Sequence, residues 1–197
     1  MKANELELKA KALNTLRADR RITKRSVISS ELPLPERGIR ADLAVATGKR
    51  LIGIEIKSDF DSLRRLERQL AAYTKTFDET ILLLGEKHIG SIDLSAHDHI
   101  HVWAIEESSV VKLNSPRIMV PHRKPSVERR EMLELFNIRF AETSAVFWEK
   151  VSGRKIEAGD ISLLSRYHEL REEKEKKKRE FIEIWTSWSK ERASGAS

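Results

Sequence analysis

Residues 40–57 carry the pattern that most limits how this chain folds. Two runs rich in β-branched and aliphatic residues flank the polar stretch Thr47-Gly48-Lys49-Arg50. A short polar stretch with one glycine between two such runs predicts a β-hairpin with a tight turn. With the turn centred on Gly48 and Lys49, Asp42 lies directly opposite Glu55, and directly opposed residues have Cβ atoms about 5 Å apart.

Strand geometry then predicts which side chains meet on each face of this hairpin. Side chains alternate along a strand, so Glu55 and Lys57 share one face while Ile54 and Ile56 point into the core. Asp42 and Glu55 are close enough to hold one cation between their carboxylates. The pattern therefore brings two acids and a lysine together beside an otherwise apolar strand pair.

This set of groups suits the hydrolysis of a phosphodiester. A divalent metal activates bound water and acts as a Lewis acid, and Mg²⁺ (or Mn²⁺) prefers oxygen ligands. Asp42, Glu55 and the backbone carbonyl of Ile56 make a reasonable site, with Lys57 steadying the attacking water or the phosphate. The alternative is structural, since acids opposite acids or lysines are common at solvent-facing edges of hairpins.

Composition limits the class of protein. The 197 residues suit one core domain with an appendage, and about two-fifths of them are hydrophobic. We expect a cytoplasmic protein without a membrane segment, because no apolar run is long enough to span a bilayer and the first residues are not a signal peptide. The absence of cysteine excludes disulfides and thiolate zinc sites.

The net charge of +6 favours an anionic partner, most commonly a nucleic acid. The basic residues form local clusters, each of which either contacts phosphate or is a solvated face: Arg17, Arg20, Arg21, Lys24 and Arg25; Arg64, Arg65 and Arg68; and Arg123, Lys124, Arg129 and Arg130.

Hydrophobic periodicity predicts an α/β fold for the first 120 residues. The expected order is helix, three strands, helix, strand and strand, at residues 4–18, 27–32, the hairpin, 60–77, 80–85 and 99–105. The strand–helix–strand piece from 51 to 85 is a crossover, so its two strands should be parallel. The result is a mixed sheet with helices on its faces.

The composition changes from Pro125 onward. We predict a helical extension over residues 125–197, appended to a core of residues 1–120, with one helix over 126–151 and a second from Asp160 through the charged block 171–180. Trp148, Trp185 and Trp188 lie at helical spacing among apolar residues, which more often indicates core or homodimer contacts than base stacking.

The hairpin motif also resembles a known group of enzymes. Arg40-x-Asp42 followed by Glu55-Ile56-Lys57 resembles the PD-(D/E)XK nuclease superfamily, whose core is an αβββαβ unit, although Ala41 stands where many members have proline. The longer pattern resembles the sce7726-type members of bacterial and phage genomes; it comprises Glu55-Ile56-Lys57-Ser58-Asp59, Leu63, Arg65-Leu66, Gln69, Tyr73 and Phe77-Asp78. Gln69 and Tyr73 also resemble the Gln-x-x-x-Tyr element of RecB-type nucleases.

The resemblance implies a Mg²⁺-dependent deoxyribonuclease with a role in DNA repair, recombination or defence. Asp42 and Glu55 would bind the metal and Lys57 would be the catalytic lysine. Gln69 and Tyr73 would line the site and place the DNA strand. Glu5 of the first helix, with Glu7 as the alternative, would be a further ligand, and Arg64, Arg65 and Arg68 are candidates for DNA contacts.

Three alternatives stay open. The chain is either a nuclease, a non-catalytic nucleic-acid-binding protein that keeps the same fold, or an interaction protein that acts through its C-terminal helices. Glu31 is either a supporting group of the site or a solvated edge residue. His97, His99 and His101 suggest a transition-metal site, but without a thiolate partner a structural role is more common.

Overall fold

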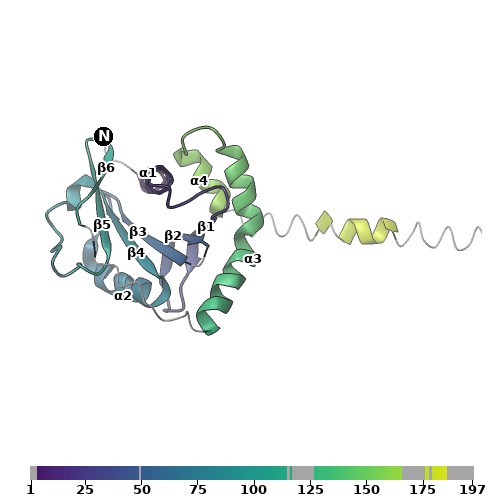
Figure 1. Cartoon of the computed structure of the whole chain (residues 1–197), viewed down its shortest axis with the longest axis horizontal. Coiled ribbons are helices and arrows are strands. Elements are labelled where there is room, and N and C mark those ends of the chain that lie inside the picture. Colours follow the sequence, from purple (N-terminus) through teal and green to yellow (C-terminus); the bar gives the residue numbers. More distant parts are fainter. Residues whose placement is uncertain are drawn as a thin grey trace, which may run out of the picture. The chain divides into compact units, whose positions relative to one another are not determined.

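A six-stranded mixed sheet forms the centre of the protein, with strand order β1-β2-β3-β4-β5-β6 (Figure 1). The computed structural model describes residues 4–48, 50–114, 116, 127–165, 176–177 and 179–185. The strands are β1 (Val27–Pro33), β2 (Arg40–Thr47), β3 (Arg50–Lys57), β4 (Glu79–Leu84), β5 (His101–Glu106) and β6 (Ser109–Lys112). The pairs β3–β4 and β4–β5 are parallel and the other three are antiparallel, so the protein has an α/β fold, as predicted.

The hairpin of β2 and β3 has the predicted register. Thr47 pairs with Arg50 and Leu43 pairs with Ile54. Gly48 has a φ of +57°, in the left-handed region that a tight turn requires and that glycine adopts without a steric penalty. The side-chain alternation that follows from this register places Ile54 and Ile56 in the apolar core with Leu43.

Helix α1 (Glu5–Ala18) closely matches its predicted bounds. Asn4 caps it, with a capping box formed by the side chains of Asn4 and Glu7. Leu8 and Leu13 are buried on the core face of this helix, whereas Leu6 is 42% exposed.

The predicted helix over 60–77 begins later than expected. A 3₁₀ turn, η1 (Leu63–Arg65), precedes α2 (Leu66–Thr76), and the side chain of Ser62 accepts a hydrogen bond from the Arg64 N–H at its start. The residues before Ser62 form a separate turn in which Asp61 accepts hydrogen bonds from the Ser58 N–H and hydroxyl. Local side-chain hydrogen bonds of this kind compete with helix formation.

The two helices that follow residue 125 and end before residue 166 belong to the same compact unit as the sheet. The unit extends from Met1 to Ser165, and residues 166–197 form a second unit. The predicted boundary between a core of 1–120 and an extension of 125–197 therefore differs from the structure. The reason is packing: α3 (Val127–Lys150) contacts β1, and α4 (Ala158–Ser165) contacts α1 and α3.

Helix α3 also satisfies backbone groups at the open edge of β1. The Ser144 hydroxyl accepts a hydrogen bond from the Ile28 N–H (2.8 Å) and lies 3.1 Å from the Ile28 carbonyl. Trp148 is buried and its indole N–H donates to the Ser26 carbonyl at 2.7 Å. An uncovered edge strand is open to pairing with another chain, so α3 protects this edge.

The predictions for the end of the chain and for the last strand have different outcomes. Helix α4 is described over Ala158–Ser165, and most of the predicted helix through 171–180, with Trp188, lies outside the described residues. Strand β6 was not predicted. Within the described part of the chain, no helix combines the length and the apolar character needed to cross a membrane.

Gly53 and Phe77 generate a test of the crossover packing. Phe77 directly follows α2 and packs against Gly53 of β3. A Cβ on Gly53 would lie 2.1 Å from the Phe77 ring. We expect Gly53→Ala to lower the free energy of unfolding by about 1–3 kcal/mol, because overpacking a filled core forces side chains off their preferred rotamers. Urea denaturation followed by circular dichroism measures the change.

Gly159→Ala is the matched control, because Gly159 lies in α4 and a Cβ there would have no neighbour within 4 Å. The control should be neutral or stabilising. Equal stability of Gly53→Ala and the native protein would contradict the packing argument.

Candidate functional site

A polar pocket of about 260 Å³ opens where β2 and β3 part, next to α1 and α2. The regular pairing of these strands runs up to Leu43 and Ile54. Beyond that pair, the Ile56 N–H donates to the Asp42 carboxylate at 2.6 Å. Both charge signs are represented among the residues that line the pocket: Glu5, Glu31, Asp42, Glu55 and Asp61, with Lys57, Arg40, Arg65 and Arg68.

The predicted pair of acids and the lysine meet in this pocket. Lys57 Nζ lies 2.6 Å from Glu55 Oε1, and both side chains are nearly inaccessible to solvent. Glu55 and Lys57 point away from the face occupied by Ile54 and Ile56, as strand alternation predicts. Asp42 is on the neighbouring strand, and its charge interacts with that of Glu55.

Gln69 and Tyr73, one turn apart on α2, hold this group from the other side. The Gln69 side-chain oxygen accepts a hydrogen bond from Lys57 at 2.8 Å. The Tyr73 hydroxyl accepts from the Asp42 N–H at 3.0 Å and donates to the Ile54 carbonyl at 3.3 Å. Gln69 lines the pocket, but Tyr73 is fully buried behind it. Tyr73 therefore does not line the pocket as expected, its hydroxyl contacts the backbone of Asp42, and its part in placing a DNA strand stays a prediction.

Burial controls the protonation of the two acids. It raises the pKa of Asp42 to about 8, and the neighbouring charge of Glu55 adds to this effect. Burial also raises the pKa of Glu55, although Lys57 opposes the shift. A hydrogen bond from the Tyr73 side chain also opposes the shift, and Oε2 of Glu55 is buried. Desolvated carboxylates of this kind favour either a proton or a cation.

Glu31 contributes to the site more directly than the sequence indicated. Ser30 pairs with Leu43 and Leu32 with Ala41, so Glu31 lies opposite Asp42 on the neighbouring strand. Its φ of +58° is in the left-handed region, which only a few per cent of non-glycine residues adopt. Carboxylate oxygens of Glu5, Glu31 and Asp42 all lie within 4.8 Å of one another.

Lys9 and Asp61 are two residues at the site that sequence analysis missed. Lys9 is buried, and its ammonium contacts both Glu5 and Glu31. The i, i+4 spacing of Glu5 and Lys9 on one helix face was the available signal, but a pair of this kind is usually solvated. Asp61 follows the Glu55-Ile56-Lys57 strand closely and lines the pocket.

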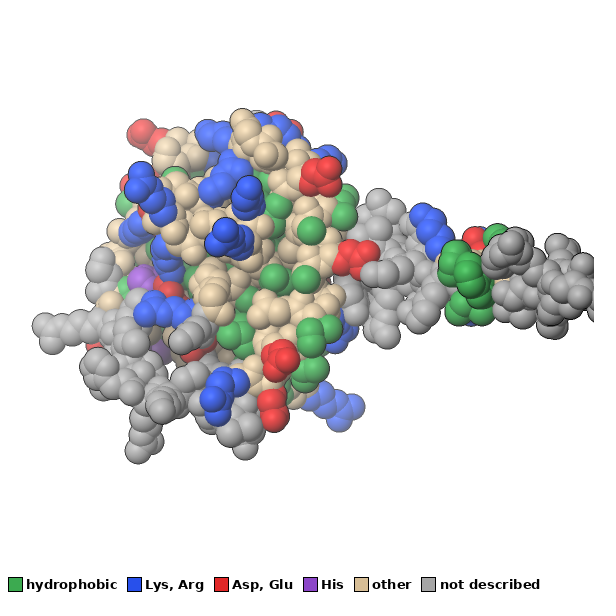
Figure 2. Space-filling view, turned by 45° about the vertical axis from the view of Figure 1, so that its right-hand side comes forward, with side chains coloured by type: hydrophobic (Ala, Val, Ile, Leu, Met, Phe, Trp, Pro, Cys, Tyr) green, Lys and Arg blue, Asp and Glu red, His purple; other side chains and the backbone are tan. Residues whose placement is uncertain are grey.

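The basic residues around the pocket only partly match the prediction. Of the three arginines predicted to contact DNA, Arg65 and Arg68 line the pocket and Arg64 does not. Arg40 also lines the pocket, although it was not predicted as a DNA contact. Arg68 donates to the Arg37 carbonyl at 2.8 Å and so connects α2 with the loop between β1 and β2. Lys and Arg side chains are otherwise spread in small groups over the surface of the compact unit seen in Figure 2.

The histidines and tryptophans have structural contacts. His101 Nε2 lies 2.6 Å from Glu79 Oε1, and His97 Nε2 lies 3.4 Å from Glu67 Oε1. Among the residues that the structure describes, the group of three or more acids and histidines close enough for a metal is the acidic one at the pocket. Trp148 is a core residue, as expected, while Trp185 is exposed and stacks on Phe181 in the second unit.

The raised pKa of Asp42 leads to a test of stability against pH. The pKa is about 8 in the folded protein and about 3.8 in the unfolded chain, so the folded state binds the extra proton between these values. The metal-free protein should therefore lose stability as pH rises through this window. Asp42→Asn cannot ionise, so we expect it to be more stable than the native protein by about 1–3 kcal/mol near pH 8 in EDTA.

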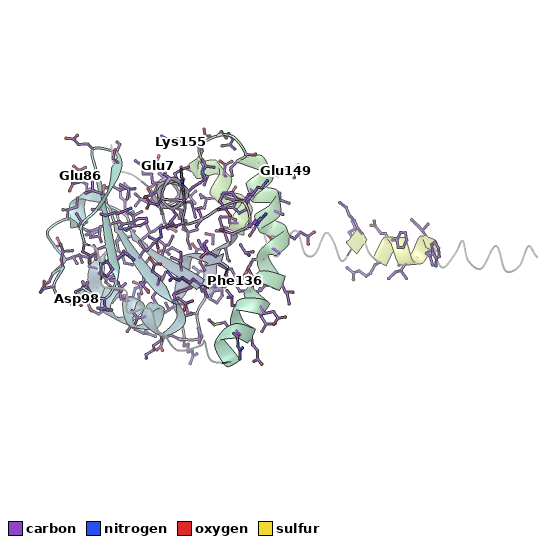
Figure 3. The ribbon with its side chains drawn as sticks, in the orientation of Figure 1. Glu7, Glu86, Asp98, Phe136, Glu149 and Lys155 are labelled. Carbon is purple, nitrogen blue, oxygen red and sulfur yellow. The ribbon has the colours of Figure 1, made fainter. Side chains whose placement is uncertain are left out.

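Urea denaturation at about pH 5 and about pH 8 measures this difference. Asp98→Asn is the control, because Asp98 is exposed at the periphery of the compact unit (Figure 3) and should leave the pH dependence unchanged. A native protein whose stability rises between these pH values relative to Asp42→Asn would contradict the assignment.

The chain is similar to known phage proteins. Residues 1–138 match the family described as Bacteriophage P4 protein cII. Protein cII of Enterobacteria phage P4 is 33% identical over 84 residues, which cover 43% of this chain and 31% of that protein, so the similarity spans less than a third of the relative's length. Among solved structures, a protein of unknown function from Silicibacter pomeroyi aligns with a TM-score of 0.48 at 18% identity, over 75% of this chain and 90% of that one. Because the family match covers well over half of its residues, this chain belongs to the bacteriophage P4 protein cII family.

Proposed function

We propose that the protein is a metal-dependent nuclease of the PD-(D/E)XK type that hydrolyses DNA phosphodiester bonds. The observation that carries the proposal is the meeting of Asp42, Glu55 and Lys57 in one polar pocket. The element order α1-β1-β2-β3-α2-β4 is also the order of the αβββαβ core that the sequence motif resembles.

The acids of the pocket have the chemistry that a divalent cation requires. Asp42 and Glu55 are desolvated acids with raised pKa values, and a cation would compensate both charges. The ammonium of Lys57 bonds to Glu55 Oε1, so the buried Oε2 is the candidate ligand atom of Glu55. Ile56 also lines the pocket, so its carbonyl is a third candidate ligand.

Mg²⁺ or Mn²⁺ bound by these groups would supply Lewis acidity and a lowered pKa for bound water. The protein's own contribution is charge and position. Lys57 is held by Glu55 and Gln69, so its ammonium is fixed in the pocket and can donate to a phosphate oxygen or to the attacking water. Tyr73 fixes the backbone of Asp42.

The positive side of the pocket suits an anionic polymer. Arg40, Arg65 and Arg68 line the pocket together with the five acids. Arginine binds phosphate through several N–H donors in a planar arrangement, and phosphate contacts provide much of the affinity for DNA. These arginines are therefore proposed to bind the DNA backbone on either side of the cleaved bond.

The direct test is incubation of the purified protein with linear, circular, single-stranded and branched DNA in Mg²⁺, Mn²⁺ or EDTA. We expect cleavage that depends on the metal. DNA binding without any product in either metal would instead favour a non-catalytic nucleic-acid-binding protein.

Lys57→Met tests the catalytic role of the lysine. We expect the cleavage rate to fall by about 100-fold or more, since loss of a positioned donor commonly costs this much. Circular dichroism and thermal unfolding verify that the variant is folded.

Lys155→Met is the matched control for Lys57→Met. Lys155 is exposed in the loop between α3 and α4 (Figure 3), and its replacement should leave the rate unchanged. Cleavage by Lys57→Met at the native rate on several DNA forms would refute the proposal.

A further inference from the structure

Lys9 is a buried cation that the proposed nuclease chemistry does not use. It lies on α1 and is 2% exposed, although it is one of the longest and most strongly hydrated side chains. It does not line the pocket, whereas its partners Glu5 and Glu31 do. Lys9 therefore stands behind the acidic wall of the pocket and not in front of it.

The hydrogen bonds of Lys9 are complete. Its ammonium lies 2.6 Å from Glu5 Oε1, 2.5 Å from Glu31 Oε1 and 3.2 Å from the Ser30 hydroxyl. An ammonium has three N–H donors, so these three acceptors use all of them. Lys9 has no donor left for a substrate phosphate, which separates its role from that of Lys57.

The charge on Lys9 is retained despite its burial. Burial alone would lower the pKa of Lys9, but the hydrogen bonds and charges of Glu31 and Glu5 outweigh it and raise the pKa above the ordinary value. Removing a charged partner from such a buried group is strongly unfavourable. If a divalent ion took Glu5 and Glu31 as its ligands, the Lys9 ammonium would lose its partners while still buried in the protein interior.

The position that Lys9 occupies is suited to a cation. Carboxylate oxygens of Glu5, Glu31 and Asp42 lie within 4.8 Å of one another, a spacing that ligands of a single ion can adopt. Acids this close need a cation or protons between them. Lys9 pairs directly with Glu5 and Glu31 and its charge also lowers the pKa of Asp42, while Arg40 Nε lies 3.6 Å from Glu31.

We propose that the ammonium of Lys9 is a built-in substitute for a second divalent ion, so that the pocket takes one Mg²⁺ or Mn²⁺, at Asp42 and Glu55. Glu5 and Glu31 are then partners of Lys9 and not metal ligands. That the pocket binds one metal ion rests on the proposed function. That Lys9 occupies the space between Glu5 and Glu31 does not. Lys9 is a positioning residue, since it acts through the carboxylates.

Counting bound Mn²⁺ by isothermal titration calorimetry and by electron paramagnetic resonance on the full chain tests this. We expect one Mn²⁺ for the native protein and for Lys155→Met, and one more for Lys9→Met, because Glu5, Glu31 and Asp42 lose the cation that compensated them. A purely structural lysine would lower stability without creating a metal site. Two ions in the native protein, or the same count in folded Lys9→Met, would overturn the inference.

Glu5→Gln keeps the test decisive if Lys9→Met does not fold. Glu5 is about half exposed, so this change should leave the fold intact. We expect an unchanged Mn²⁺ count and an affinity within about threefold of the native value, since Glu5 interacts with the ion only through screened charge. Loss of an ion in Glu5→Gln would show that Glu5 is a ligand and would refute the role of Lys9.

The two proposals fail in different ways. A native protein that binds no Mn²⁺ and cleaves no DNA refutes the nuclease, while a gain of one ion in Lys9→Met still supports the role of Lys9. A native protein that binds one ion and cleaves DNA supports the nuclease, while an unchanged count in folded Lys9→Met refutes only the role of Lys9.

Discussion

The parting of β2 and β3 beyond Leu43 and Ile54 is the constraint on which the pocket depends. A continuous ladder would bind the Ile56 N–H to a backbone carbonyl, but here the Asp42 carboxylate accepts it. The result is a pair of acids, Asp42 and Glu55, at the margin of an apolar sheet. Both have raised pKa values because the folded chain removes them from water.

Polar side chains of two helices offset the cost of burying these charged groups. Helix α2 contributes Gln69 and Tyr73, which hold Lys57 and the Asp42 backbone. Helix α1 contributes Lys9, whose partner Glu31 adopts a left-handed backbone conformation on β1. Formation of the site is therefore coupled to the docking of both helices.

The position of β1 explains why the compact unit includes α3. Strand β1 carries Glu31 and is the edge of the sheet, so its position needs support from outside the ladder. Ser144 and Trp148 of α3 provide that support through hydrogen bonds to Ile28 and Ser26. A strand held in this way keeps the acidic wall of the pocket in place.

Short-range patterns in the sequence determined the hairpin register, the parallel crossover and the grouping of Asp42, Glu55 and Lys57, because strand alternation and helix periodicity are local properties of the chain. The place of Gln69 beside them was predicted from the resemblance of its motif to a known family. Only the tertiary structure decided that Lys9 and Glu31 join the site, that Tyr73 lies behind it, and that the compact unit continues to Ser165. These features depend on which element covers which face and edge of the sheet. Burial and contacts between distant segments set that arrangement, and no local pattern encodes it.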